Sequence, residues 1–149
     1  MAVNLVRSAR LFAGTGYAYA AKASAGDLVF TAGACPLDEQ GSIVAPGDLI
    51  AQTRHALANL RIALEDSGAA IEDVAKTTIY VASSDRGELA AAFDEVAAFF
   101  GDHDVPSTLL GVAVLGYTNQ LVEIEAIAVQ PTQARRAAAS HTATPPAGE

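Results

Sequence analysis

The chain of 149 residues has no tryptophan, one cysteine and few basic side chains. The single Cys35 excludes an internal disulfide and any zinc site built from several thiolates, and it suits a reducing compartment. The three histidines lack metal-ligand spacing, so we expect no metal. No apolar run reaches the length of about 18 residues that a membrane helix needs, and we see no signal-peptide pattern. We therefore expect a cytoplasmic protein that has no membrane partner.

Basic residues are scarce relative to acidic ones. Nine Lys and Arg stand against seventeen Asp and Glu, which gives a formal net charge of −8. This charge repels polyanions, so we expect no nucleic-acid partner. Hydrophobic residues make up 51% of the chain, which is enough for one packed core.

The chain divides into three parts by pattern. An N-terminal segment covers 1–16, and one domain of ordinary length covers 17–130. The remainder, 131–149, combines Ala, Thr, Pro and polar residues without an apolar period. Such a segment buries too little surface to offset the entropy of ordering, so we expect a disordered tail.

The hydrophobic periods predict an α+β domain. Apolar residues at intervals of three or four predict helices over 48–67 and 85–100, each opened by an Asp that can cap it. Runs compatible with β structure cover 17–23, 28–34, 74–81, 108–115 and 120–129, and turn residues within the first and last pairs predict two hairpins. We expect one mixed sheet with both helices on one face. Two helices cannot cover the second face, so self-association over it is expected.

Two carboxylates two residues apart are the most unusual local feature. At a strand period of two, Glu123 and Glu125 point to the same face as Ile127 and Val129. One interpretation is a solvated outer face; the other is a carboxylate that orients or deprotonates a water in a cleft. Cys35 has no adjacent base or helix start, which favours a small buried side chain over a nucleophile.

Three segments together resemble the RidA/YjgF family: 27–38 (DLVFTAGACPLD), 73–81 (DVAKTTIYV) and 122–129 (VEIEAIAV). The resemblance implies a chorismate-mutase-like fold, assembled as a homotrimer around a central β-barrel, with small-molecule clefts at the subunit interfaces. Family enzymes hydrolyse enamines and imines, such as 2-aminoacrylate and 2-iminobutanoate, to 2-keto acids and ammonia without a cofactor or metal.

The resemblance also assigns residues to the cleft. Glu123 matches the carboxylate that positions the attacking water, Tyr19 a cleft tyrosine, and Gly33 the strand-end loop that lines the site. Thr108 falls where a backbone N–H contacts the substrate. Pro106 stands where the family has the arginine that clamps the substrate carboxylate, which marks this chain as a divergent member.

The lost arginine predicts weak deaminase activity on 2-imino acids. A guanidinium binds a carboxylate through two charge-assisted bonds worth about 1.5–3 kcal/mol each, and proline has no N–H to replace them. The loop residues Ala32 and Ala34, where the family has Ser and Gln, make the pocket less polar. Tyr117 either supplies a compensating hydroxyl or aromatic wall, or is ordinary surface.

Two functions from different classes remain open. The first is a RidA-like hydrolase of a small imine, enamine or related reactive metabolite. The second is a non-catalytic trimer that binds a metabolite or a protein, which the missing arginine favours. A third possibility, suggested by the ribonuclease label of the family, is opposed by the net charge of −8.

Overall fold

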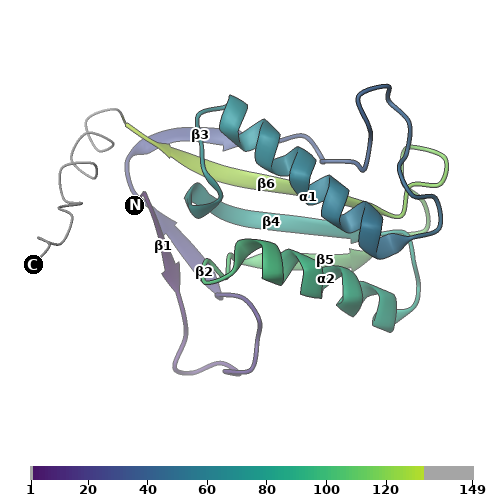
Figure 1. Cartoon of the computed structure of the whole chain (residues 1–149). Coiled ribbons are helices and arrows are strands. Elements are labelled where there is room, and N and C mark those ends of the chain that lie inside the picture. Colours follow the sequence, from purple (N-terminus) through teal and green to yellow (C-terminus); the bar gives the residue numbers. More distant parts are fainter. Residues whose placement is uncertain (1, 133–149) are drawn as a thin grey trace, which may run out of the picture.

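A computed structural model describes residues 2–132, so most of the expected tail, 133–149, lies outside the described residues. Figure 1 shows the two helices lying side by side across one face of the larger sheet. The elements in chain order are β1 (Val3–Val6), β2 (Ala20–Ala23), β3 (Gly26–Phe30), α1 (Leu49–Asp66), the 3-10 helix η1 (Ile71–Asp73), β4 (Val74–Val81), α2 (Arg86–Phe100), β5 (Ser107–Gly111) and β6 (Val122–Pro131).

The strand pairing differs from the expected hairpins. A two-stranded antiparallel sheet joins β1 to β2, and a four-stranded sheet has the order β3-β6-β4-β5. Strands β2 and β3 therefore belong to different sheets, and β4 lies between β5 and β6. Both predicted hairpins are wrong because turn residues show where a chain reverses, not which strand it then pairs with. Strand β5 instead runs parallel to β4 after the crossover through α2.

Both helices begin where their acidic caps predict. The Asp48 carboxylate accepts a hydrogen bond from the Ala51 N–H at 2.9 Å, and the Asp85 carboxylate accepts one from the Gly87 N–H at 2.7 Å. Each bond satisfies a backbone donor that the first helical turn leaves without an intrahelical partner. The expected arrangement of two helices on one face of a mixed sheet is confirmed.

The core lies between the helices and the sheet. Alternate residues of β6 point toward the helices, as the period of a strand requires. Fully or almost fully buried side chains there include Leu57, Leu60 and Leu64 of α1, Val96 and Phe100 of α2, Ile79 and Val81 of β4, and Val122, Ile124, Ala126 and Ala128 of β6.

A β-bulge interrupts the alternation of β4. The register shifts between Val74 and Lys76, so that Val74 lies opposite Ala128 and Lys76 lies opposite Ile127. A strict alternation would put Ala75 on the same face as Thr77, but the bulge turns Ala75 to the other face, where it packs with the Val129 cluster. Lys76 lies on the same face as Thr78 and Tyr80, as the period of two requires.

We call the sheet face opposite the helices the open face. The β1–β2 ribbon covers one corner of it, where Ala2 and Val3 pack against Val129. Elsewhere large apolar side chains are exposed: Leu28 at 59%, Phe30 at 68% and Leu110 at 43%. Among the described residues, neither helix is long and apolar enough to cross a membrane.

Candidate functional site

Glu123 lies on the open face of β6, half-buried and directly opposite Tyr80 of β4. Its Oε2 accepts a hydrogen bond from Nε2 of Gln120 at 3.1 Å. Gly33 lies against the same carboxylate, since a Cβ atom at that position would clash with the Glu123 side chain. Glycine thus leaves room for this side chain where it stands, which brings two residues predicted for the site into contact.

Gln120 orients the Glu123 carboxylate, and its own amide group is held by further hydrogen bonds. Its side chain is almost completely buried; Nε2 also donates to the Val122 carbonyl at 3.1 Å, and Oε1 accepts from the Tyr117 N–H at 3.0 Å. Tyr117 thus contacts this site through its backbone, while its side chain is 49% exposed.

Helix α1 holds the loop that contains Gln120. Buried Gln52 donates to the Asn119 carbonyl at 2.9 Å and accepts from the Leu121 N–H at 2.8 Å. The sequence analysis missed Gln52 and Gln120. An amide on the apolar side of a helix is the signal that would have found Gln52, because a buried polar group needs partners.

Cys35 adds a thiol beside Glu123. Burial raises the pKa of this thiol, and the negative charge of Glu123 raises that pKa further. The thiol, which donates to the Gly33 carbonyl at 3.5 Å, stays protonated near neutral pH. The uncharged Cys35 thiol is suited to form part of the wall of the site.

Two of the other predicted residues, Pro106 and Thr108, form a second group at the start of β5, and Tyr19 lies just before β2. Pro106 is buried, and its carbonyl accepts from the Thr77 N–H at 3.0 Å. Thr108 is exposed, and its Oγ1 accepts from Nζ of Lys76 at 2.5 Å. The Tyr19 hydroxyl donates to the Phe12 carbonyl at 2.7 Å and lines a separate cavity of about 100 Å³.

The two groups are far apart within one chain. Ser107 lies opposite Thr77 of β4, whereas Glu123 lies opposite Tyr80. Three residues along β4 span about 10 Å, and β5 and β6 are separated by two strand spacings of about 4.8 Å. A distance of about 14 Å therefore separates Glu123 from the start of β5. A single subunit does not close the predicted site.

Glu125 lies on the same face as Glu123, as the sequence predicts. Its Oε1 accepts from the Tyr80 hydroxyl at 2.8 Å. This hydrogen bond raises the pKa of Tyr80 above its ordinary value, and partial burial adds to the effect. Within residues 2–132 no group of three His, Cys, Asp or Glu side chains could hold a metal ion.

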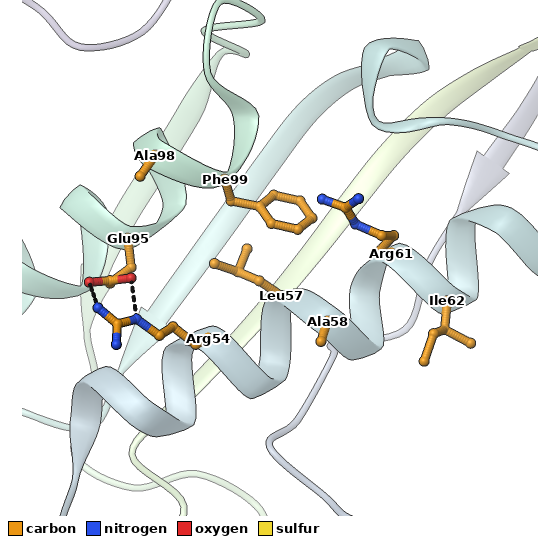
Figure 2. Close-up of a pocket in the computed structure, with 8 residues that line it drawn as sticks. All are labelled: Arg54, Leu57, Ala58, Arg61, Ile62, Glu95, Ala98 and Phe99. Carbon is orange, nitrogen blue, oxygen red and sulfur yellow. Dashed lines mark hydrogen bonds and ion pairs between the residues drawn. The ribbon is translucent and has the colours of Figure 1, made fainter.

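The helix face carries a groove of about 610 Å³ between α1 and α2 (Figure 2). Arg54 donates to both carboxylate oxygens of Glu95 at 2.8 and 2.9 Å, and the Arg61 guanidinium lies 4.7 Å from the centre of the Phe99 ring. Arg54 and Glu95 thus occupy one another, and Arg61 is stacked on an aromatic ring. The groove lies on the side of the sheet away from Glu123, which leaves the open face as the better candidate.

Comparisons with known proteins identify relatives of this chain. The model of the endoribonuclease L-PSP family matches residues 8–130. A RutC family protein of Pyrococcus horikoshii is 34% identical over 110 residues, covering 74% of this chain and 85% of that protein. A 2-iminobutanoate/2-iminopropanoate deaminase of Salmonella typhimurium is 34% identical over 108 residues, covering 70% and 81%.

A solved structure shares the fold. The Rid family protein YyfB of Yersinia pestis, whose function is described as unknown, superimposes with a TM-score of 0.82 at 30% identity. The match covers 87% of this chain and 99% of that protein. The chain therefore belongs to the RidA/YjgF family, the family that the endoribonuclease L-PSP model describes.

Proposed function

We propose that this protein hydrolyses a small imine, or an enamine after its tautomerisation to the imine. The observation that carries the proposal is the Glu123 carboxylate, which Gln120 and Gly33 hold in one position on the open face. The similarity to a 2-iminobutanoate/2-iminopropanoate deaminase supports the same reaction class. A fixed carboxylate that faces a cleft is suited to general-base catalysis.

The reaction proceeds through addition and elimination. Glu123 accepts a proton from a water as its oxygen attacks the carbon of the C=N bond, and it returns that proton to the nitrogen, which gives a neutral carbinolamine. The carboxylate then accepts the hydroxyl proton as the carbonyl forms and passes it to the nitrogen, which leaves as ammonia when the C–N bond breaks. The products are a ketone or keto acid and ammonia, and the carboxylate is regenerated.

A homotrimer completes the site. In this assembly the open faces surround a central barrel, and the β5 edge of one subunit faces Glu123 of the next. The partner edge brings the backbone N–H of Thr108 toward developing negative charge, while Tyr19 lines the cleft. The separation of about 14 Å within one chain and the exposed Leu28 and Phe30 support this arrangement.

The substrate preference follows from the start of β5. Pro106 offers neither a cation nor an N–H, so an imine with a carboxylate lacks its usual clamp. The loss of one such clamp lowers transition-state binding about tenfold to several hundredfold. In a chain that carries the arginine, the clamp makes carboxylate-bearing imines react faster than neutral ones. We expect this difference in rate to be smaller for the present chain.

The direct test supplies enzymatically generated 2-iminobutanoate and a neutral imine, and follows their loss by semicarbazide capture. Glu123→Gln should lower kcat by about 100-fold or more, the usual contribution of a general base. Glu39→Gln, an exposed carboxylate in a loop, is the matched control and should keep full activity. Undiminished hydrolysis by the Glu123→Gln protein would remove Glu123 from the mechanism.

A gain-of-function test addresses the missing clamp. Pro106→Arg and Ser107→Arg each place a guanidinium at the start of β5; the second is included because Pro106 is buried and Ser107 only half-buried. At least one variant should raise kcat/KM for 2-iminobutanoate about tenfold or more relative to the neutral imine. No relative gain in either folded variant would contradict the proposed location of the clamp.

A binding function without turnover is the second candidate. Pro106 at the substrate-facing edge favours it, because binding and orientation of a charged substrate are weakened there. Ligand-induced shifts of the melting temperature across a metabolite panel, together with no product formation, would identify this case. RNA cleavage, suggested by the family description, is opposed by the net charge of −8.

A further inference from the structure

The open face contains a small pocket that is distinct from the Glu123 site. The pocket lies between β3, β6 and β4 and has a volume of about 140 Å³. Its walls include Phe30 and Ile127, and its polar groups come from Lys76, Thr78 and Glu125. Glu123 does not line it. The pocket thus combines one cation, one anion, a hydroxyl and an apolar wall.

Lys76 faces this pocket because it lies on the same face of β4 as Thr78 and Tyr80, as the strand period of two requires. Its position opposite Ile127 places it on the open face. The ammonium donates to Thr108 Oγ1 and forms no ion pair with a carboxylate of residues 2–132. Burial without a negative partner lowers the pKa of Lys76. A bound carboxylate would offset this penalty.

Glu125 supplies the opposite charge without neutralising Lys76. Thr78 lies opposite Glu125 and Lys76 lies opposite Ile127, so the two charged residues occupy diagonal positions. Diagonal positions of an antiparallel pair are about 7 Å apart. No ion pair joins the two side chains in the described part of the chain, although both line the pocket. Tyr80 occupies Oε1 of Glu125.

The size of the pocket limits its ligand. A volume of about 140 Å³ holds about five water molecules at about 30 Å³ each, which corresponds to a ligand of about five to seven heavy atoms. An α-amino acid of that size separates its carboxylate and ammonium by one carbon. With a charge-assisted hydrogen bond of about 2.8 Å at each end, it has the size to bridge side chains that start from diagonal positions about 7 Å apart.

We propose that this pocket binds a small α-amino acid, with its carboxylate on Lys76 and Thr78 and its ammonium on Glu125. The side chain of the ligand lies against Phe30 and Ile127. The site does not depend on hydrolysis at Glu123. In the trimer proposed above, it lies on the wall of the barrel interior.

The test compares zwitterions with singly charged analogues. Calorimetric titration of the full chain with L-alanine and L-serine should show saturable binding of one molecule per chain. Propionate and ethylamine, which each lack one charge, should bind at least tenfold more weakly. Lys76→Met and Glu125→Gln should each weaken alanine binding about tenfold or more, the effect of one charged hydrogen bond. Exposed Lys22→Met and Glu39→Gln are matched controls and should bind normally.

Further measurements separate the alternatives. Unfolding midpoints verify that both pocket variants are folded, and the Glu123→Gln protein should still bind alanine. Loss of binding in that variant would place the ligand at the hydrolytic site and overturn this proposal. It would be overturned equally by the absence of binding to the wild-type chain, by equal affinity for propionate and alanine, or by pocket variants that change the sedimentation coefficient. The last result would assign Lys76 and Glu125 to contacts between copies of the chain.

Discussion

The two faces of the four-stranded sheet differ sharply although the same strands build both. On the helix face, the residues of β4 and β6 are almost completely inaccessible, and all except Thr77 are apolar. On the open face, the intervening positions carry Glu123, Glu125, Lys76 and Tyr80 beside exposed Leu28 and Phe30. The helix face thus supplies the stability of one chain, and the open face supplies the groups that need a ligand or another subunit.

Polar groups on the helix side show how complete that face is. Buried Gln52 and Thr53 are hydrogen-bonded to backbone carbonyls, and buried Thr77 pairs with Ser107. Within the described part of the chain, no buried side-chain nitrogen or oxygen lacks a hydrogen-bond partner. Unsatisfied polar groups are costly in a core, so the core between the helices and the sheet is complete in its hydrogen bonding.

The largest effect should come from a matched pair of leucine substitutions. Leu60 is completely buried on the helix face, whereas Leu28 is 59% exposed on the open face. Leu60→Ala should lower the free energy of unfolding by about 2–5 kcal/mol, because it leaves a cavity. Leu28→Ala should cost a dilute single chain less than about 0.5 kcal/mol.

Urea unfolding at low protein concentration measures both values, and sedimentation at higher concentration follows assembly. Leu28→Ala should weaken self-association. Leu60→Ala should affect self-association only because it unfolds part of the protein. Equal losses of chain stability in the two variants would show that the open face is already packed within one subunit.

A pair of glycine substitutions tests whether the Glu123 carboxylate is tightly packed on the open face. Gly33→Ala forces a methyl group against the Glu123 side chain and should cost about 1–3 kcal/mol of stability, with loss of imine hydrolysis. Gly116→Ala is the matched control, because no atom lies within 4 Å of the added Cβ. Should Gly33→Ala keep full activity and stability, the contact with Glu123 is not rigid.

The support of Glu123 by Gln120 gives a smaller expected effect. Gln120→Leu removes the hydrogen bond to Glu123 and leaves the Tyr117 N–H without its acceptor. It should cost about 1 kcal/mol of stability and lower kcat about tenfold with little change in KM. Steady-state kinetics on a reactive imine measure the split. A change confined to KM would indicate that Gln120 contacts the substrate instead.

Local features could be predicted from the sequence, whereas long-range pairing could not. Asp48 and Asp85 mark helix starts because a cap acts within one turn, and Glu123 and Glu125 share a face because a strand has a period of two. The parallel pairing of β4 with β5 depends on how α2 packs across the sheet, which turn residues do not encode.

The site was only partly predictable for the same reason. The resemblance to the family suggested both Gly33 and Glu123, which lie in contact. The separation of Glu123 from Pro106 follows from the strand order, in which β4 lies between β5 and β6. The role of Gln120 depends on a loop that Gln52 anchors from α1, and a hydrophobic pattern carries no information on such a contact.

The smallest effect concerns the response of the open face to alkaline pH. The hydrogen bond to Glu125 raises the pKa of folded Tyr80 above the ordinary value of about 10. The folded chain therefore holds the phenolic proton more tightly than the unfolded chain. This contribution to stability is complete below about pH 10 and is lost as pH rises through the folded pKa.

The free energy of unfolding of Tyr80→Phe should therefore fall less steeply with rising pH than that of the wild type. Tyr117→Phe, at an exposed tyrosine, should follow the wild-type curve. Lysine deprotonation acts on all three chains alike and cancels in the comparison, which is made by urea unfolding at a series of pH values. Identical curves for all three proteins would mean that the Tyr80–Glu125 bond does not persist in solution.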